Sequence, residues 1–390
     1  MTTGAPGRWR RALRIAAVAA VALAGTGQAC ASERLPGAMT WTAYDVASSG
    51  YAQSVAIGGA LKRRIGVTLR VLPNKTAVAR LAPLREKKAE FAVLGLSAFF
   101  SMEGVHEFAM RDWGPQPTRI LLTSNADSNL AIGTARDAGI RTLADLKGKR
   151  IAHVGGSATL QENVAAMLAF AGLAWSDVTR VEFADFGAAW QGVVDGKADA
   201  AWSQTISGPA AQLEASPRGI HWPPVPHADV AGWARLRKVA PFFAPHIATL
   251  GAGLSKANPH EGATYPYPIL TTYAGRSGGM VHAMTKAMVE LFPDYRDAVP
   301  GADGWAIDRQ TFDWVVPYHE GAVRYLLEAG VWTPAHQTHN DRLIARQTVL
   351  AEAWKGMEAQ RSLADEAFAA AWVGVRAAAL DRAGFDPYWR

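Results

Sequence analysis

The chain has almost no cysteine: Cys30 is the only one among 390 residues. A single thiol cannot form an internal disulfide, so the stability of the fold has to come from a buried core, which a chain of this length can supply. The sequence also lacks a Lys/Arg run, and its formal charge is only +6. This pattern argues against a nucleic-acid-binding protein. Beyond residue 31 no apolar run reaches the roughly 20 residues of a membrane-spanning helix.

Signatures of catalysis and of metal binding are missing as well. No G-x-S-x-G elbow, P-loop or G-x-G-x-x-G occurs. His336 and His339 have the spacing of metal ligands, but no third ligand is evident, so we interpret them as a chance pair. The sequence therefore predicts no catalytic residue, no metal and no cofactor.

Residues 1–31 have the three parts of a secretory signal peptide. A basic segment, with four arginines between Arg8 and Arg14, precedes the apolar run 15–25 and a small-residue stretch that ends at Ala31. We expect cleavage after Ala31, which leaves a cysteine-free chain of 359 residues and a formal charge of about +2. A twin-arginine signal at Arg10–Arg11, a lipid anchor on Cys30 and an uncleaved N-terminal anchor are the alternatives.

The remaining chain alternates between strand-like and helix-like segments, which predicts an α/β fold with helices on both faces of mixed sheets. Residues 217–268 are rich in proline and glycine and are expected to be irregular. Helices are expected to dominate after residue 280. Strands are expected at 40–45, 67–72, 91–94, 129–135, 150–154, 181–184, 198–202 and 269–273.

Four segments, in this order, resemble the TAXI-type solute-binding proteins of TRAP transporters. They are SSGYAQSVAIGGAL at 48–61, KAEFAVL at 88–94, TLADLKGKRIA at 142–152 followed by GGSAT, and VPYHEGAVRYLLEAG at 316–330. The chain departs from that family's pattern at Ser54–Ala56 and at Gly95–Ser97, so the resemblance does not name the ligand.

The resemblance implies a type II periplasmic-binding fold, with two lobes around a ligand cleft and a TRAP permease as partner. The chain would cross twice between lobes, near Asp127 and near Tyr265. We expect a monomer whose first lobe comprises 32–127 and 265–334, whose second comprises 128–264, and whose residues 335–390 form a helical extension over the first lobe.

Candidate binding residues lie at the turns that follow the predicted strands, because ligands of open α/β sheets bind there. The turn 155–159 starts a helix, whose free N–H groups and dipole favour a carboxylate or phosphate, although Ser157 could simply cap that helix. The candidates are Ser48, Ser49, Gly50, Tyr51 and Gln53; Lys75; Ser97; Gly155, Gly156, Ser157 and Thr159; and Ser203 and Gln204.

These expectations define an exported receptor that binds a small carboxylate-bearing solute and delivers it to a membrane permease. Two alternatives stay open at this point. One is a periplasmic binding subunit for a sensor kinase. The other is an exported enzyme that uses the cleft between the lobes for chemistry.

Overall fold

The computed structural model describes Met1 and residues 34–390, so Cys30 and the predicted signal peptide beyond Met1 lie outside the described residues. The first of its two large sheets has five strands in the order β2-β1-β3-β12-β4. All run parallel except β12, which is antiparallel to β3 and β4. The bounds are β1 Ala38–Ala43, β2 Thr68–Pro73, β3 Phe91–Leu94, β4 Thr118–Thr123 and β12 Ile269–Tyr273.

The second sheet repeats this arrangement with the order β7-β6-β8-β5-β9. Here β5 is the strand that runs antiparallel to both of its neighbours. A two-stranded hairpin of β10 and β11 accompanies it. The bounds are β5 Leu130–Ala135, β6 Arg150–Val154, β7 Thr179–Phe183, β8 Ala200–Gln204, β9 Ile220–His221, β10 Ala244–Ala248 and β11 His260–Thr264.

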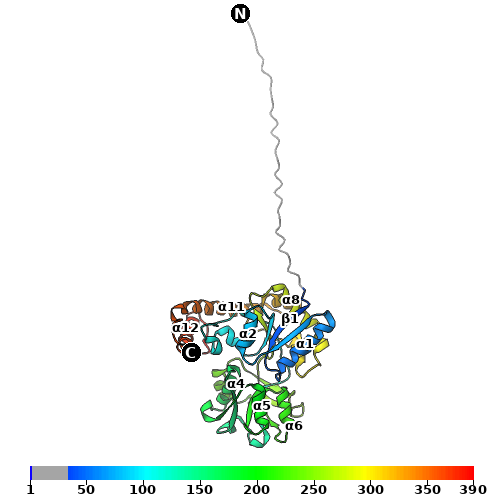
Figure 1. Cartoon of the computed structure of the whole chain (residues 1–390), viewed down its shortest axis with the longest axis vertical. Coiled ribbons are helices and arrows are strands. Elements are labelled where there is room, and N and C mark those ends of the chain that lie inside the picture. Colours follow the sequence, from blue (N-terminus) through cyan, green and yellow to red (C-terminus); the bar gives the residue numbers. More distant parts are fainter. Residues whose placement is uncertain (2–33) are drawn as a thin grey trace. The chain divides into compact units, whose positions relative to one another are not determined.

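Helices pack against both sheets, and those around the second sheet appear in green in Figure 1. No helix among the described residues is long and apolar enough to span a membrane. The bounds are α1 Ser49–Ile65, α2 Ala77–Arg85, α3 Ser97–Glu103, α4 Ala158–Phe170, α5 Phe186–Val194, α6 Gly208–Ala215, α7 Val230–Val239, α8 Gly278–Glu290, α9 Phe292–Tyr295, α10 Glu320–Glu328, α11 Pro334–Lys355 and α12 Asp365–Arg382.

The fold class predicted from the sequence is confirmed. The chain is an α/β protein of two mixed sheets with the strand order of the type II periplasmic-binding fold, and its C-terminal part is helical. Local signals mark several boundaries. The Thr76 hydroxyl accepts from the Ala79 N–H at 3.1 Å and starts α2, while Gly172 has φ +73° just after α4, a conformation that favours glycine.

Three local predictions were wrong. Strand β4 was not expected, and residues 217–268 contain α7 and three short strands instead of an irregular segment. Strand β8 ends at Gln204, so Ser203 and Gln204 lie within it and not in a turn after it. Its partner β5 supplies the ladder over these residues, with Ser203 opposite Ala131. Pairing between strands that are distant in the sequence determined where these strands lie. A local sequence pattern carries no information on that pairing.

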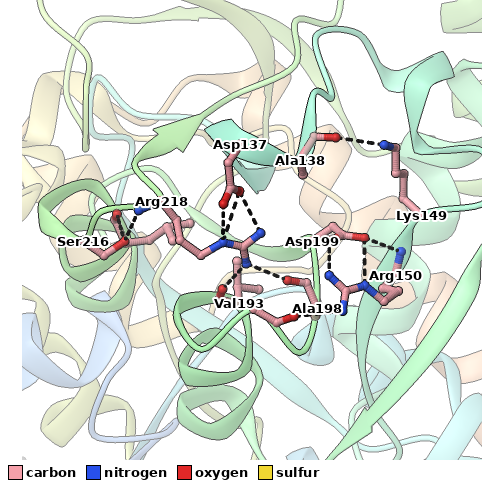
Figure 2. Close-up of polar contacts among 11 residues, drawn as sticks. Asp137, Ala138, Lys149, Arg150, Val193, Ala198, Asp199, Ser216 and Arg218 are labelled. Carbon is pink, nitrogen blue, oxygen red and sulfur yellow. Dashed lines mark hydrogen bonds and ion pairs between the residues drawn. The ribbon is translucent and has the colours of Figure 1, made fainter.

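Arginine–carboxylate pairs join the segments at the end of the second sheet where β6 begins (Figure 2). The guanidinium of Arg150 binds Asp199 bidentately, at 2.6 and 3.2 Å. Arg218 pairs with Asp137 at 2.8 Å and also donates to the carbonyl oxygens of Val193 and Ala198. Since Asp137 and Arg150 are substantially exposed, these pairs are expected to add little stability individually.

The C-terminal helices α11 and α12, drawn in orange to red in Figure 1, pack against α3 and the residues that follow it. Glu103, at the end of α3, is fully buried and pairs with Arg346, at 2.6 Å, and with Arg376. The Trp372 indole N–H donates to the Gly104 carbonyl at 2.6 Å. The extension is therefore joined to the first sheet's elements by a buried ionic network.

Candidate functional site

A narrow cavity of about 60 Å³ lies where residues from the two sheets meet. This volume holds a few water molecules, or a ligand of a few non-hydrogen atoms. Most of its wall comes from the carboxyl-terminal ends of parallel strands and the segments that follow them, where ligands of open α/β sheets bind. The start of β5 and the segment between β11 and β12 complete it. The wall residues are Tyr44, Ser48, Ser49, Arg80, Gly95, Ser97, Leu130, Ser157, Thr159, Leu160, Asn163, Phe186, Trp202, Ser203, Gln204, Ser207, Tyr265 and Tyr267.

Serines at helix starts supply several of the hydroxyl groups of this cavity. Ser48, Ser157 and Ser207 are the N-caps of α1, α4 and α6, and each side-chain oxygen accepts a backbone N–H of its own helix. As a hydroxyl can accept and donate at once, capping leaves the proton of each group for another partner. Ser157 therefore caps its helix and also lies in the cavity wall.

Three polar atoms of the wall have no hydrogen-bond partner among the described residues. They are Ser97 Oγ, Thr159 Oγ1 and Asn163 Oδ1, all buried. The Asn163 amide has one partner, because its Nδ2 donates to the Tyr265 hydroxyl at 2.9 Å. A buried polar atom without a partner costs about 1–3 kcal/mol. A bound molecule that hydrogen-bonds to these atoms would remove that cost.

Arg80 brings a positive charge to the wall. It lies on α2, its side chain is 6% exposed, and its guanidinium carbon is 5.0 Å from the centre of the Tyr44 ring. Its Nε donates to the Thr76 carbonyl at 3.3 Å, and it forms no ion pair with a carboxylate of the described residues. Burial lowers the pKa of the guanidinium, yet an arginine stays protonated in proteins. A buried charge of this kind is costly unless it is paired.

Glu107 is the carboxylate that acts on the pKa of Arg80, and its effect is smaller than those of Tyr44 and Tyr267. Burial raises the pKa of the Glu107 carboxyl group, and neither of its oxygens has a hydrogen-bond partner among the described residues. Glu107 is not part of the cavity wall. The positive charge of Arg80 is thus open to an anion from the cavity side.

Contacts across the cavity hold it closed. The Ser49 hydroxyl donates to Gln204 Oε1 at 2.5 Å, and the Gln204 amide nitrogen donates to Ser128 Oγ at 2.9 Å and to the Tyr267 carbonyl at 3.3 Å. Tyr267 lies so close to Gly95 that a Cβ there would come within 2.7 Å of its ring. The wall residues of the first sheet and of the second are therefore already in contact.

The structure brings seven of the predicted site residues into the wall: Ser48, Ser49, Ser97, Ser157, Thr159, Ser203 and Gln204. The other six lie outside it. Gln53 is buried and accepts from the Trp305 indole at 2.8 Å, and Lys75 forms an exposed ion pair with Asp185 at 2.6 Å. Gly50 lies in the first turn of α1 and is close to Pro268, and the next residue, Tyr51, is half-buried. Gly155 and Gly156 are exposed and precede α4.

Sequence reasoning missed Arg80, Asn163 and the tyrosines of the wall. A signal for Arg80 exists: the buried positions of α2 are Ala77, Arg80, Leu81 and Leu84, an i, i+3, i+4, i+7 stripe. One arginine in an otherwise apolar stripe indicates a charge that faces the interior. His336 and His339 make separate backbone contacts, and the described residues contain no cluster suited to a metal ion.

Comparisons with known proteins give a family and distant structural likenesses. Residues 46–330 match the profile of the NMT1-like family. No curated protein matches the chain in sequence. Among solved structures, the alkanesulfonate-binding protein SsuA from Xanthomonas axonopodis pv. citri, bound to MOPS, has a TM-score of 0.43 and 16% identity over 87% of this chain and 98% of its own.

Two other matches are similarly distant. PhnD1 from Prochlorococcus marinus (MIT 9301), in complex with methylphosphonate, has a TM-score of 0.40 and 11% identity over 66% of this chain and 84% of its own. An ABC transporter periplasmic binding protein from Brucella ovis with glutathione bound has a TM-score of 0.42 and 10% identity over 67% of this chain and 70% of its own. At these values the likeness does not extend to the ligand or the partner.

The family resemblance inferred from the sequence was wrong. The profile that matches residues 46–330 is that of the NMT1-like family, not a TAXI-type profile. The prediction of a TRAP permease as partner depended on this resemblance and is not supported. The quoted segments encode caps and turns of the fold: Thr142 and Asp145 form a capping box, and His319 caps α10. Features of this kind follow from the backbone geometry and are shared by proteins with different partners.

Proposed function

We propose, from the premise that the chain belongs to the NMT1-like family, that it is an exported solute-binding protein which encloses a small organic anion and delivers it to a membrane transporter. One observation carries the proposal: the unpaired guanidinium of Arg80 and three unpartnered polar atoms belong to the wall of one cavity. The oxygen atoms of an anion would pair with the guanidinium and accept from the Ser97 and Thr159 hydroxyls. Asn163 Oδ1 is an acceptor, so it would need an N–H or O–H group of the same ligand.

The composition of the wall favours binding over catalysis. As the structure describes it, the wall contains no histidine, cysteine, lysine, aspartate or glutamate. Apart from Arg80, its ionisable groups are tyrosines, and burial raises the pKa of each of the three. A general base that works near neutral pH is therefore lacking in this wall. We propose that the ligand leaves unchanged.

Delivery requires an open state, since the cavity is closed. We propose that residues 34–127 and 265–334 move as one lobe and residues 128–264 as the other, about the two crossings near Asp127 and Tyr265. Such a hinge changes a few backbone dihedrals and swings whole elements. A ligand that contacts both lobes stabilises the closed form in proportion to its preference for that form.

The test is a ligand screen by thermal shift on refolded, ligand-free protein. Small carboxylates, sulfonates and phosphonates are compared with neutral amides of the same size. A ligand at 100 times its dissociation constant is expected to stabilise the fold by about 2.7 kcal/mol. Stabilisation by the neutral compounds alone would overturn the anion proposal, and turnover of a bound anion, detected by mass spectrometry, would favour an exported enzyme.

A second arm separates delivery to a transporter from signalling. The liganded protein is added to membrane vesicles of the source cell that carry either the candidate permease or the candidate sensor kinase. Ligand uptake into the permease vesicles supports the proposal. Kinase autophosphorylation without uptake would instead identify the chain as the binding subunit of a sensor.

A further inference from the structure

The last residues of the chain, 385–390, follow α12 and pack against α3. The indole ring of Trp389 lies 5.3 Å from the ring of Phe99, 5.5 Å from that of Phe100 and 5.7 Å from that of His106, measured between centroids. Tyr388 also contacts Phe99, at 5.6 Å. We refer to residues 385–390 as the C-terminal tail.

Arginines of the extension fix the backbone of this tail. Arg376 donates to the Trp389 carbonyl at 2.9 Å, and Arg346 donates to the Asp386 carbonyl at 3.0 Å. Both guanidinium groups are the partners of the buried Glu103. Since Glu103 ends α3 and the unpartnered Ser97 begins it, the tail is held to a helix that contributes to the cavity wall.

The same tail also reaches the other side of the cavity. The Trp389 indole N–H donates to Glu162 Oε1 at 3.1 Å. Glu162 lies on α4, which packs against β6 and α7 of the second sheet and carries the wall residues Thr159 and Asn163. Burial raises the pKa of the Glu162 carboxyl group, and the bond from Trp389 opposes this shift. Trp389 thus contacts α3 through its ring and α4 through its N–H group.

We propose that the C-terminal tail is a strap which joins the two lobes and stabilises the closed cavity. This inference rests on the proposed function, because it concerns the opening and closing of that cavity. Separation of α4 from α3 breaks the bond between Trp389 and Glu162, or pulls Trp389 out of its aromatic contacts. The strap therefore raises the closed fraction before any ligand binds, and a larger competent fraction means a higher apparent affinity.

A distance measurement on ligand-free protein tests the strap. Spin labels are placed on Ile65→Cys in α1 and Val230→Cys in α7, both exposed, in a Cys30→Ser background that removes the only native thiol. Electron–electron double resonance then gives the closed-to-open ratio. Trp389→Phe keeps an aromatic ring but loses the N–H donor, and Glu162→Ala removes the acceptor. Each is expected to lower the ratio about tenfold, since a charged partner is lost.

Two comparisons make the result specific. The double variant is expected to match either single variant, because both remove the same contact. Trp332→Phe is the control, since its indole N–H bonds to Gln337 within the first-lobe and extension residues, at 3.0 Å, and it should leave the ratio unchanged. An unchanged ratio in Trp389→Phe and Glu162→Ala, or full additivity in the double variant, would overturn the strap.

The measurement needs no ligand, so it is separate from the test of the proposed function. If no anion binds but the variants shift the ratio, the strap stands and the anion proposal fails. If anions bind and the variants leave the ratio unchanged, only the strap fails.

Discussion

The two sheets have the same strand order but contribute different chemistry to the cavity. The first sheet and its helices supply the charge, from Arg80 on α2, whereas the second supplies neutral groups such as Asn163 and Gln204. The equivalent topology explains why both sets of residues lie at the carboxyl ends of strands. The side chains, and not the topology, place the positive charge of the wall on the side of the first sheet.

The two halves also differ in how their ion pairs are used. Glu103 and its two arginines are buried beneath the extension, whereas the pairs at the edge of the second sheet are partly in water (Figure 2). A buried charge that loses its partner is costly, while an exposed pair contributes little. The variants below test the difference between buried and exposed ion pairs, and the difference between the charged and the neutral side of the cavity.

The largest effect is expected for Glu103→Gln. It leaves Arg346 and Arg376 without a charged partner in the interior, so the free energy of unfolding should fall by about 3–5 kcal/mol. Asp137→Asn, which weakens the pair with Arg218, is the control and should cost less than about 1 kcal/mol. Urea denaturation measures both. Equal losses would mean that burial does not distinguish the two networks.

Arg80→Met should reduce the affinity for the anion by about 2–5 kcal/mol, which is thirtyfold or more, because the ligand loses its buried charge partner. The same change should raise the ligand-free melting temperature, as it removes an unpaired buried charge. Arg85→Met, at the exposed end of α2, is the control. Calorimetry measures the expected loss of affinity, and thermal unfolding measures the expected rise in melting temperature. A lower melting temperature with unchanged affinity would contradict the role of Arg80.

Ser157→Asp tests the neutral side of the cavity. Aspartate is as good an N-cap as serine, so α4 should start normally. The added negative charge lies in the wall, and we expect anion affinity to fall by about thirtyfold through like-charge repulsion. Thr142→Asp, at a cap that is not part of the wall, should leave the affinity unchanged. Calorimetric titration distinguishes the two variants.

A smaller effect concerns acid stability, and each half carries buried histidines that contribute to it. Burial lowers the pKa of His106, after α3, and of His260, in β11, to about 4. The unfolded chain binds these protons near pH 6.5 and the folded chain only near pH 4, so stability falls as the pH drops between these values. At pH 5 each histidine is expected to cost about 2 kcal/mol relative to pH 7.

Glutamine variants check this assignment. His106→Gln and His260→Gln should each flatten the fall in the free energy of unfolding between pH 7 and pH 5, by a similar amount. Arg376 adds to the lowered pKa of His106 only. A slope that stays the same in both variants would place the acid sensitivity in other groups.

Much of the local structure could be predicted from the sequence. Strands β3, β6 and β12 have the predicted bounds, and a local hydroxyl, that of Thr76, caps α2. These features depend on residues next to one another, such as an apolar β-branched run or a hydroxyl before a helix. The predicted turns around Ser48 and Ser157 contribute to the cavity for the same reason, since a strand followed by a helix start places them at the sheet's carboxyl edge.

The chemistry of the site was decided by the tertiary structure. Lys75 was the only cationic residue among the predicted site residues, but it forms an exposed ion pair with Asp185, and Arg80, further along the chain on α2, lies in the wall. The bond between Trp389 and Glu162 joins residues 227 positions apart. Sequence periodicity tells which face of a helix is buried, but not which distant element covers that face. Only the packing of the two sheets and the extension decides which buried polar groups find partners and which are left for a ligand.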